Sequence, residues 1–302
     1  MNASVRLGFL AAAGAYSIWG LLPLYFKVLG HLAPEEMLAH RIIWSLPTGF
    51  ILIAIARNWS DLRAAITPAR LGWLGISAAL IGVNWLTYIW SVSEDRVMEA
   101  SLGYYMNPLV NVAIGAVFFS ERLRAGQWVA FALAAIGVAV ITVAYGRPPW
   151  IALLLCFSFA AYSIIRKKVQ VDGRAGLIVE AAMLAPLAAI WLGWFVQQPD
   201  GRIMGEGGWD IPLILLSGPI SAFPLIFFAI AAKRLKLSTI GMMQYSAPTL
   251  QFLLAVFVFR EPFSTTHLIA YAFIWTALIV FTVDSVAGER KARRLARAAE
   301  IA

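Results

Sequence analysis

Long apolar runs separated by short polar linkers dominate the pattern of this chain. The hydrocarbon layer of a bilayer is about 30 Å thick, and a helix crosses it with roughly 20 apolar residues. Lipid offers backbone groups no hydrogen-bond partner, so a spanning run is read as a helix. Ten runs qualify, at 6–28, 35–56, 71–93, 97–119, 126–145, 149–168, 176–197, 211–232, 238–259 and 265–286. The pattern predicts an all-α polytopic membrane protein with ten transmembrane helices.

Composition supports lipid as the solvent of this chain. Of the 302 residues, 61% are hydrophobic and 13% are charged, which is more apolar surface than one soluble core can bury. The net charge of +8 comes from Lys and Arg residues spread in small groups between the apolar runs. Because no basic face is formed, the charge indicates membrane topology and no nucleic-acid partner.

The distribution of positive residues predicts the orientation. With ten spans, one side receives 18 Lys and Arg residues and the other receives 5, and positive residues accumulate on the cytoplasmic side. We therefore expect an inner (plasma) membrane protein with both termini in the cytoplasm. The segment 289–302 is then a basic cytoplasmic tail, and the Gln197–Asp210 linker faces outward.

The chain repeats itself at a shift of about 140 residues. Tyr105 then meets Tyr245, Pro108 meets Pro248, and Glu121 meets Glu261. The halves are residues 1–146 and 147–288, each with five predicted helices. Because five is odd, the second half is inverted relative to the first. Inverted repeats are common in secondary transporters, which bind the solute near the midplane between the halves.

Two prolines occupy equivalent positions in the fourth and ninth predicted spans. Pro108 and Pro248 cannot donate a backbone hydrogen bond, so we expect kinks that free the carbonyls of Tyr104 and Gln244. Polar groups at this depth are costly unless they face the bundle interior or a wet cavity. The candidates for lining a central cavity here are Tyr104, Asn107, Asn111, Gln244 and Tyr245. The alternative is that the prolines only shape packing and the amides join helices.

Aromatic residues in the first and third spans extend this candidate site. Tyr16, Asn84 and Trp85 could line the same cavity, where ring faces suit amphipathic or cationic solutes. The competing interpretation assigns the aromatic residues to the belts at the membrane interfaces.

Arg41 is the most unusual residue of the apolar runs. It lies about 6 residues, roughly 9 Å, inside the outer end of the second span, where a cation needs a partner. One hypothesis pairs Arg41 with Glu99 near the outer end of the fourth span. In a second hypothesis, Arg41 binds an anionic group of the solute. In a third, its long side chain extends so that the guanidinium snorkels to the membrane interface.

Several other functions find no support in the sequence. The chain has one cysteine, no Cys/His cluster of metal-site spacing and no phosphate-binding Gly-x-x-x-x-Gly-Lys loop, so we expect no metal and no cofactor. An intramembrane enzyme needs a nucleophile with a base or an acidic pair, and neither pattern is present. Small residues Gly126, Ala130 and Ala134 could seat a second copy in a homodimer, although packing within the chain is favoured.

Several motifs together resemble one transporter family. They are His40-Arg41-Ile42-Ile43-Trp44-Ser45, Gly82-Val83-Asn84-Trp85, Glu99-Ala100-Ser101-Leu102-Gly103-Tyr104-Tyr105-Met106-Asn107-Pro108, Arg166-Lys167-Lys168, Leu237-Ser238-Thr239 and Gln244-Tyr245. In order and spacing they are similar to RarD proteins of the EamA group, within the drug/metabolite transporter superfamily. The resemblance implies ten helices in two inverted repeats, an inner-membrane location, export of metabolites or drugs, and no catalytic residues.

These observations favour a secondary-active membrane transporter, an exporter of small metabolites or drugs with a central cavity between the inverted repeats. A passive facilitator or channel for small solutes is the alternative within transport. The sequence leaves open the identity of the solute, the coupling ion, the direction of net transport and the oligomeric state.

Overall fold

The computed structural model describes residues 3–119, 123–198, 204–205, 208–235 and 237–301. Within these residues it is helical, with no β-strand. Its elements are α1 (Ala3–Val28), α2 (Pro34–Ala56), α3 (Trp59–Ala65), α4 (Pro68–Ser93), α5 (Val97–Phe119), α6 (Ala125–Tyr145), α7 (Trp150–Val169), α8 (Gly173–Phe195), α9 (Asp210–Ala232), α10 (Leu237–Met243), α11 (Ser246–Leu253), the π-helical turn η1 (Leu254–Val258) and α12 (Thr265–Ile301).

Eight helices in the described residues are long and apolar enough to cross a membrane: α1, α2, α4, α6, α7, α8, α9 and the first part of α12. They coincide with eight of the ten predicted spans. The other two predicted spans are the ones that carry paired prolines and amides. The fourth corresponds to α5, and the ninth is divided into α10, α11 and η1.

Local sequence explains where several of these helices begin and end. Proline occupies the first turn of α2 and α4, at Pro34 and Pro68, where its fixed φ suits a helix and its missing N–H is not needed. The Asp172 side chain accepts a hydrogen bond from the Arg174 N–H at the start of α8. At the end of α2, Arg57 adopts a left-handed conformation with φ of 53°, which terminates the helix.

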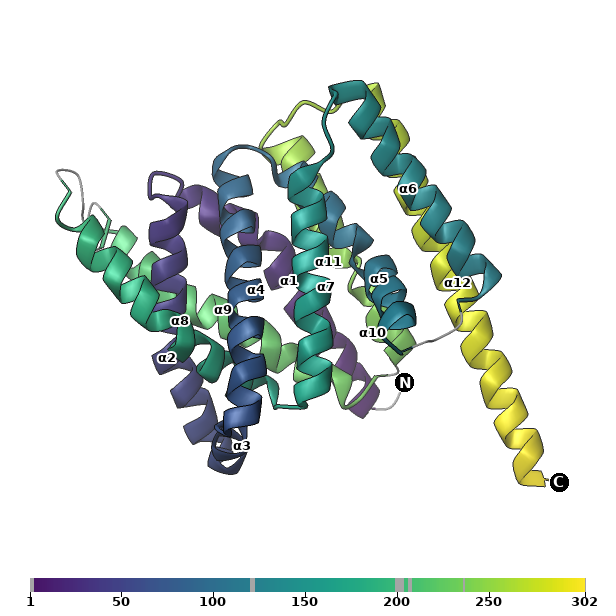
Figure 1. Ribbon diagram of the computed structural model, residues 1–302, viewed down its shortest axis with the longest axis horizontal. Coiled ribbons are helices and arrows are strands. Elements are labelled where there is room, and N and C mark those ends of the chain that lie inside the picture. Colours follow the sequence, from purple (N-terminus) through teal and green to yellow (C-terminus); the bar gives the residue numbers. More distant parts are fainter. Residues whose placement is uncertain (1–2, 120–122, 199–203, 206–207, 236, 302) are drawn as a thin grey trace.

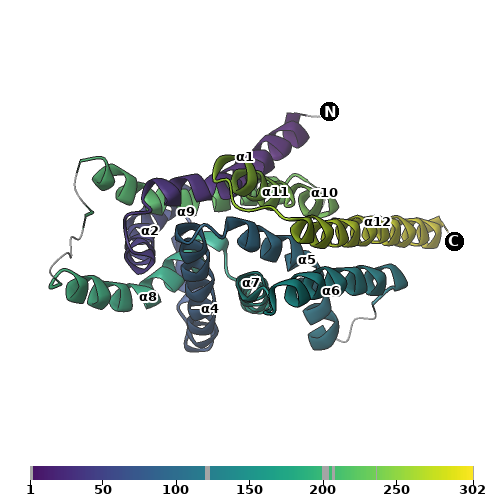
Figure 2. The same ribbon diagram turned by 90° about the horizontal axis from the view of Figure 1, so that it is seen from above.

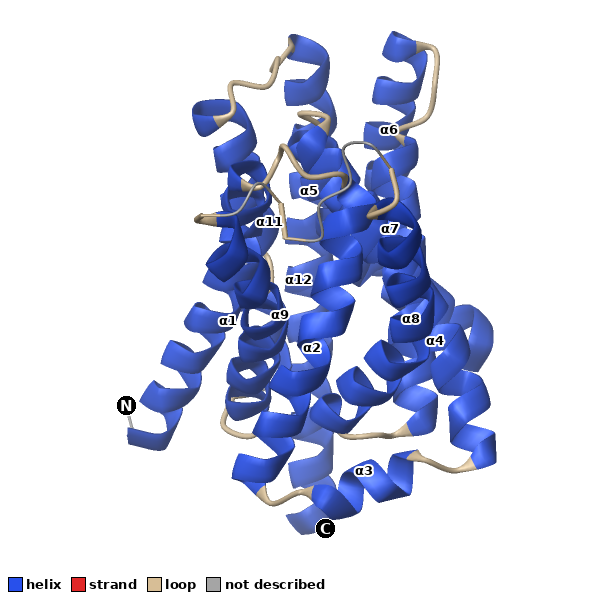
Figure 3. Ribbon diagram, turned by 90° about the vertical axis from the view of Figure 1, so that its left-hand side faces the viewer, coloured by secondary structure: helices blue, strands red, loops and turns tan. Residues whose placement is uncertain are grey.

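The helices form a bundle with one pair set to its side. Figures 1 and 2 show α6 and α12 running together along their length, beside the remaining helices. In the main bundle α2 packs against α8 and α9, α7 packs against α4 and α5, and α1 packs against α9 and α11. Figure 3 shows that α1 begins and α12 ends at the same end of the bundle, where the short helix α3 also lies.

The final helix continues into the segment that was predicted to be a tail. Residues 289–301 continue α12 beyond its apolar part, so the backbone of this basic segment is helical. The predicted outward linker Gln197–Asp210 lies partly outside the described residues, as does Glu121, the repeat partner of Glu261.

The small-residue stripe of α6 packs within the chain. A Cβ added at Gly126 would lie 2.7 Å from Asp284, and one added at Gly137 would lie 2.9 Å from the Ala270 carbonyl oxygen. Both of these neighbours belong to α12. Ala130 and Ala134 are buried in the same core. The stripe thus seats α12, in agreement with the packing interpretation favoured above.

Close approach of α9 to α2 depends on Gly218. A Cβ at this position would overlap the Trp44 carbonyl oxygen and lie 2.6 Å from the Thr48 hydroxyl. The contact lies one helical turn from Ser221 and Arg41, so Gly218 sets the distance across which these two residues meet.

We predict that Gly218→Ala forces α9 away from α2 and lowers the thermal unfolding temperature, because overpacking typically costs ~1–3 kcal/mol. The single cysteine, Cys156, is buried, so a thiol-reactive fluorescent dye reports unfolding in detergent. Gly72→Ala is the matched control, since a Cβ at Gly72 meets no atom within 4 Å. Equal unfolding temperatures for the two variants contradict the role given to Gly218.

Candidate functional site

Arg41 lies buried in the bundle among neutral groups. Its side chain comes from the second turn of α2, and the residue is 5% exposed. The guanidinium Nε donates a hydrogen bond of 2.9 Å to the Ser221 hydroxyl of α9. The guanidinium carbon lies 4.1 Å from the ring centroid of Trp85 and 5.7 Å from that of Phe26. Cation–π attraction and one hydrogen bond are the contacts that hold this charge.

The predicted Arg41–Glu99 ion pair is wrong. Glu99 Oε2 lies 2.5 Å from Arg96 Nη2, and Glu99 Oε1 accepts the Ile151 N–H at 3.0 Å. Arg96 is three residues from Glu99 along the chain, so this local partner is available whatever the packing of the helices. Within the described part of the chain, Arg41 has no carboxylate oxygen within the 4 Å of an ion pair.

Asn84 and Tyr104 join three helices next to this charge. The Asn84 amide donates to the Leu155 carbonyl at 2.9 Å and to the Ser158 hydroxyl at 3.0 Å, both in α7. The Tyr104 hydroxyl of α5 donates to Asn84 Oδ1 at 3.3 Å. Trp85, the ring partner of Arg41, directly follows Asn84 in α4, so the predicted residues Arg41, Trp85, Asn84 and Tyr104 meet at adjacent positions of this helix.

Several buried polar atoms on α2, α4 and α5, the helices that carry Arg41, Trp85 and Tyr104, have no hydrogen-bond partner in the described part of the chain. They are Trp44 Nε1, Tyr88 Oη, Asn107 Oδ1 and Asn111 Oδ1. Trp44 and Tyr88 each lie three residues after a member of the group, Arg41 and Trp85, and so share its helix face. The Tyr88 ring contacts Tyr104 with a centroid distance of 5.5 Å. Donors and acceptors on the helices that surround Arg41 are thus available to a bound molecule.

The other predicted site residues lie on a second side of the bundle. The Tyr16 hydroxyl donates to the Ile240 carbonyl at 3.4 Å, and its ring packs on Trp19 and Phe228. Gln244 and Tyr245 occupy the break between α10 and α11. None of the contacts described for these residues joins them to Arg41.

The two prolines behave differently. α5 continues through Pro108, whereas the ninth predicted span breaks just before Pro248. The expected free carbonyl at Gln244 is wrong in detail, because the Ala247 N–H donates to it at 3.4 Å. Tyr105 of α5 and Thr249 of α11 share a hydroxyl hydrogen bond of 2.8 Å, which links the two proline-bearing segments directly.

Sequence reasoning missed Ser221 and Phe26 as neighbours of Arg41. Ser221 lies 180 residues away in the chain and has no distinguishing sequence pattern. The repeat offered a signal, since Ser217, one turn earlier on the same helix, matches Ser77 at the 140-residue shift.

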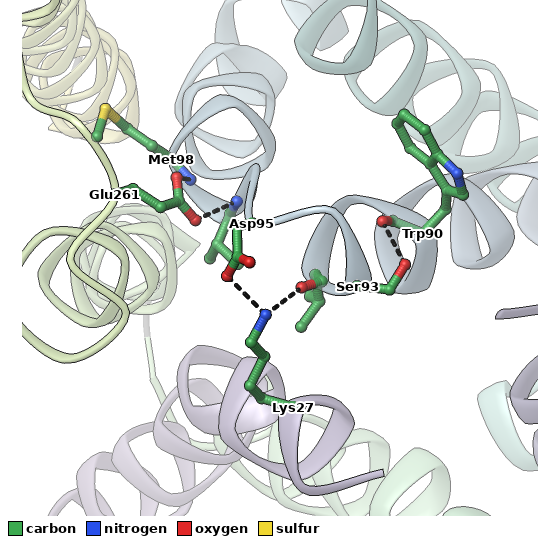
Figure 4. A network of polar contacts seen from close by, with 8 residues as sticks. Lys27, Trp90, Ser93, Asp95, Met98 and Glu261 are labelled. Atoms are coloured by element: carbon green, nitrogen blue, oxygen red, sulfur yellow. Dashed lines mark hydrogen bonds and ion pairs between the residues drawn. The ribbon is translucent and has the colours of Figure 1, made fainter. Parts of the chain in front are cut away.

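A charged cavity of about 380 Å³ lies where the α4–α5 turn, the α6–α7 turn and the loop before α12 meet. Its acidic, basic and histidine lining residues are Asp95, Arg96, Glu99, Arg147, Glu261 and His267. Beside it, Lys27 of α1 contacts Asp95 at 2.6 Å and the Val92 carbonyl at 3.4 Å, as Figure 4 shows.

Glu261 ties the loop before α12 to the first turn of α5. Its two carboxylate oxygens accept the N–H groups of Val97 at 2.6 Å and Met98 at 2.9 Å (Figure 4). Helix N-termini favour negative charge. Burial opposes this effect and dominates, raising the pKa of Glu261 to about 7.

Comparisons with known proteins place this arrangement among transporters. Residues 6–143 match the model of the EamA-like transporter family. Protein RarD of Escherichia coli is 43% identical, over 95% of this chain and 97% of its own length. An uncharacterized transporter of Vibrio cholerae is 44% identical over 96% of both chains. A chloramphenicol-sensitive protein RarD of Pseudomonas aeruginosa is 32% identical over 95% of this chain and 97% of its own. A solved crystal structure with 22% identity shares the fold, with a TM-score of 0.60 over 93% of this chain and 98% of that one.

The raised pKa of Glu261 predicts a pH dependence of stability. The folded state keeps this proton between the ordinary value of 4.5 and about 7, whereas the unfolded state has lost it. Stability therefore falls as pH rises through this window. We expect the unfolding temperature of the native protein to drop more between pH 5 and pH 8 than that of Glu261→Gln. Glu35→Gln removes an exposed carboxylate as the control. An unchanged slope in Glu261→Gln contradicts the assignment.

Proposed function

The chain belongs to the EamA-like transporter family, in its RarD branch, and on that premise we propose that it is a secondary-active exporter of small metabolites or drugs. It is a multi-pass inner-membrane protein, and both the family model and the relative in Vibrio cholerae are named as transporters. The observation that carries the proposal is a buried guanidinium, that of Arg41, whose described partners are all neutral.

A buried cation without a counter-charge is costly in a membrane protein. One hydroxyl and two ring faces leave most of the five N–H donors of Arg41 without a described acceptor. A planar guanidinium matches a carboxylate or phosphate through two parallel hydrogen bonds. The missing anion is supplied by the solute, and Arg41 is its anchor.

The surroundings of Arg41 define the rest of the solute. Trp85 and Phe26 offer ring faces to an apolar or aromatic body. Asn107 and Asn111 present amide oxygens, and Trp44 and Tyr88 present donors, to its other polar groups. The preferred solute class is a small amphipathic molecule with one anionic group, which includes amino acids and aromatic acids. Tyr16, Gln244 and Tyr245 form a second, separate wall of the transport path.

The contacts between helices support the two inverted halves, 1–146 and 147–288. When each helix is replaced by its counterpart in the other half, the pair α4–α7 becomes the pair α9–α1. The two helices of each pair are in contact. In the same way, the α5–α7 contact corresponds to the α11–α1 contact, and the α2–α9 contact corresponds to the α8–α4 contact. The fifth and tenth predicted spans, α6 and α12, pack on each other. In this proposal α5 and the α10–α11–η1 segment complete ten crossings, with Pro108 and Pro248 on the transport path.

Transport by reconstituted protein tests the role of Arg41. Proteoliposomes are assayed with radiolabelled L-phenylalanine, phenylacetate, phenethylamine and chloramphenicol, with and without a pH gradient. We expect the carboxylate probes to be concentrated against their gradient, whereas a passive facilitator only equilibrates them. Arg41→Lys should raise the half-saturation concentration about tenfold, ~1.4 kcal/mol, because lysine keeps the charge but loses the planar fork.

Two variants distinguish a role of Arg41 in binding the solute from a purely structural role. Arg41→Ala should abolish transport of the carboxylate probes, and adding Glu99→Ala should not restore it, because Glu99 is held by Arg96. Lys233→Ala removes an exposed positive charge and should leave transport unchanged. Native flux in the folded Arg41→Ala protein overturns the anchor.

Orientation is tested by fused reporters. Because 18 of the positive residues outside Arg41 fall on the side of the termini and 5 on the other, we propose that both termini are cytoplasmic. A fluorescent protein fused after Ala302 should mature in the cytoplasm, and alkaline phosphatase at the same point should be inactive. The reverse pattern contradicts this orientation.

A further inference from the structure

A second buried charge, Glu180 of α8, has no role in the solute site described above. The residue is 4% exposed. Its Oε1 accepts the Ser77 hydroxyl of α4 at 2.5 Å, and its Oε2 accepts the Tyr162 hydroxyl of α7 at 3.5 Å. Arg166 Nη1, also on α7, lies 3.6 Å from Oε1. Glu180 therefore links α8 to both α4 and α7.

The ion pair between Glu180 and Arg166 is loose. A charge-assisted hydrogen bond is typically about 2.7–2.9 Å long, which is shorter than the 3.6 Å found here. Arg166 Nη1 has no hydrogen-bond partner in the described residues, while Nη2 donates to the carbonyls of Val171 and Asp172 at 3.3 Å. The guanidinium is thus held by the α7–α8 turn, near the carboxylate but without a direct hydrogen bond to it.

Gly176 makes room for this arrangement. A Cβ at this position would overlap the Arg166 guanidinium. Arg166 can therefore lie close against the first turn of α8, with Nη1 3.6 Å from Glu180 Oε1, one helical turn further along.

The apolar surroundings leave Glu180 with few other charged neighbours. A cluster that includes Ile53, Leu74, Ile165 and Ile178 packs at this end of the bundle. From α2, Gly49 meets Ile178. On the turn before α8, Asp172 pairs with Arg174. The groups that face the carboxylate are Ser77 from α4 and Tyr162 and Arg166 from α7.

Glu180 and Arg41 occupy matching places in the two halves. Each lies seven residues beyond the first residue of its helix, Gly173 or Pro34. Each bonds a serine of a packed span, Ser77 in α4 or Ser221 in α9, and Ser221 lies one helical turn beyond Ser217, the repeat partner of Ser77. Because the halves are inverted, the cation lies toward one side of the membrane and the anion toward the other.

We propose that Glu180 is a proton-binding site that controls opening of the cytoplasmic end of the transporter. Ionised, it attracts Arg166 and keeps α4, α7 and α8 together. Protonation removes the negative charge, so the attraction to Arg166 is lost and the three helices can separate. The bound species is a proton, because Arg166 at 3.6 Å repels a metal cation and a single carboxylate offers too few ligands.

This site supplies a coupling step to the proposed export, and that step, like the cytoplasmic placement of this end, rests on the proposed function. A proton taken up from the outer side neutralises Glu180 and opens the inner end. The proton then leaves to the cytoplasm and the carboxylate re-forms its pair with Arg166. Inward movement of the proton is thereby coupled to outward movement of the solute.

The test measures opening without any solute. In a Cys156→Ser background, Leu74→Cys places a thiol in the apolar cluster, where Leu74 is fully buried. Inside-out vesicles are treated with a membrane-impermeant maleimide at pH 5.5 and pH 8. Labelling is normalised to the same protein denatured at the same pH, which corrects for thiol ionisation. We expect at least fivefold more labelling at pH 5.5 than at pH 8.

Glu180→Gln should label strongly at both pH values, because it mimics the protonated state. Arg166→Gln removes the other partner and should do the same, which keeps the test decisive if one variant folds poorly. Glu94→Gln, at an exposed carboxylate, should keep the native pH response. A native pH response in folded Glu180→Gln overturns the proton site. Native protein that shows gated labelling but transports no probe supports the proton site and contradicts the proposed function.

Discussion

The cost of leaving a charge or polar group unpaired in lipid governs this structure. Apolar helices face the bilayer, while the buried polar side chains gather where helices cross: Arg41 between α2, α4 and α9, Asn84 between α4, α5 and α7, and Glu180 between α4, α7 and α8. Each crossing is held by hydrogen bonds that cannot be exchanged with lipid. Arg41 is the exception, since its positive charge lacks a described negative partner. That imbalance makes it the natural place for an anion to bind.

Hydrogen bonds and ion pairs connect the helices at the two ends of the bundle, and we call these contacts ties. At the end away from the termini, Glu261 caps α5 and Lys27 pairs with Asp95 (Figure 4). At the other end, Glu180 and Arg166 connect α8 with α7. In the proposed transport cycle, these contacts are the ones that loosen when Arg41 becomes accessible from either side. Both ties contain a buried carboxylate, and a carboxylate is the group whose charge a proton can remove.

Sequence predicted the helices well because a long apolar run has few alternatives in lipid. The second predicted span, 35–56, matches Pro34–Ala56 within one residue. The depth of Arg41 followed from the same reasoning. Its partner did not, because depth says nothing about which direction a side chain points around its helix. Glu99 has suitable depth, yet it turns toward Arg96 and the start of α7. Likewise, a proline predicts a lost donor but not whether the helix breaks, as the contrast between α5 and the α10–α11 segment shows.

The central claim is that Arg41 binds the anionic group of a solute, and equilibrium binding to an isosteric pair tests it most directly. Phenylacetate and phenylacetamide have the same shape and differ in charge. Tryptophan fluorescence of the purified protein reports binding, since Trp85 lies 4.1 Å from the guanidinium. The account predicts that phenylacetate binds at least tenfold more tightly than phenylacetamide, and that Arg41→Gln removes this difference. Equal affinities in the native protein, or a preference that survives in Arg41→Gln, contradict it.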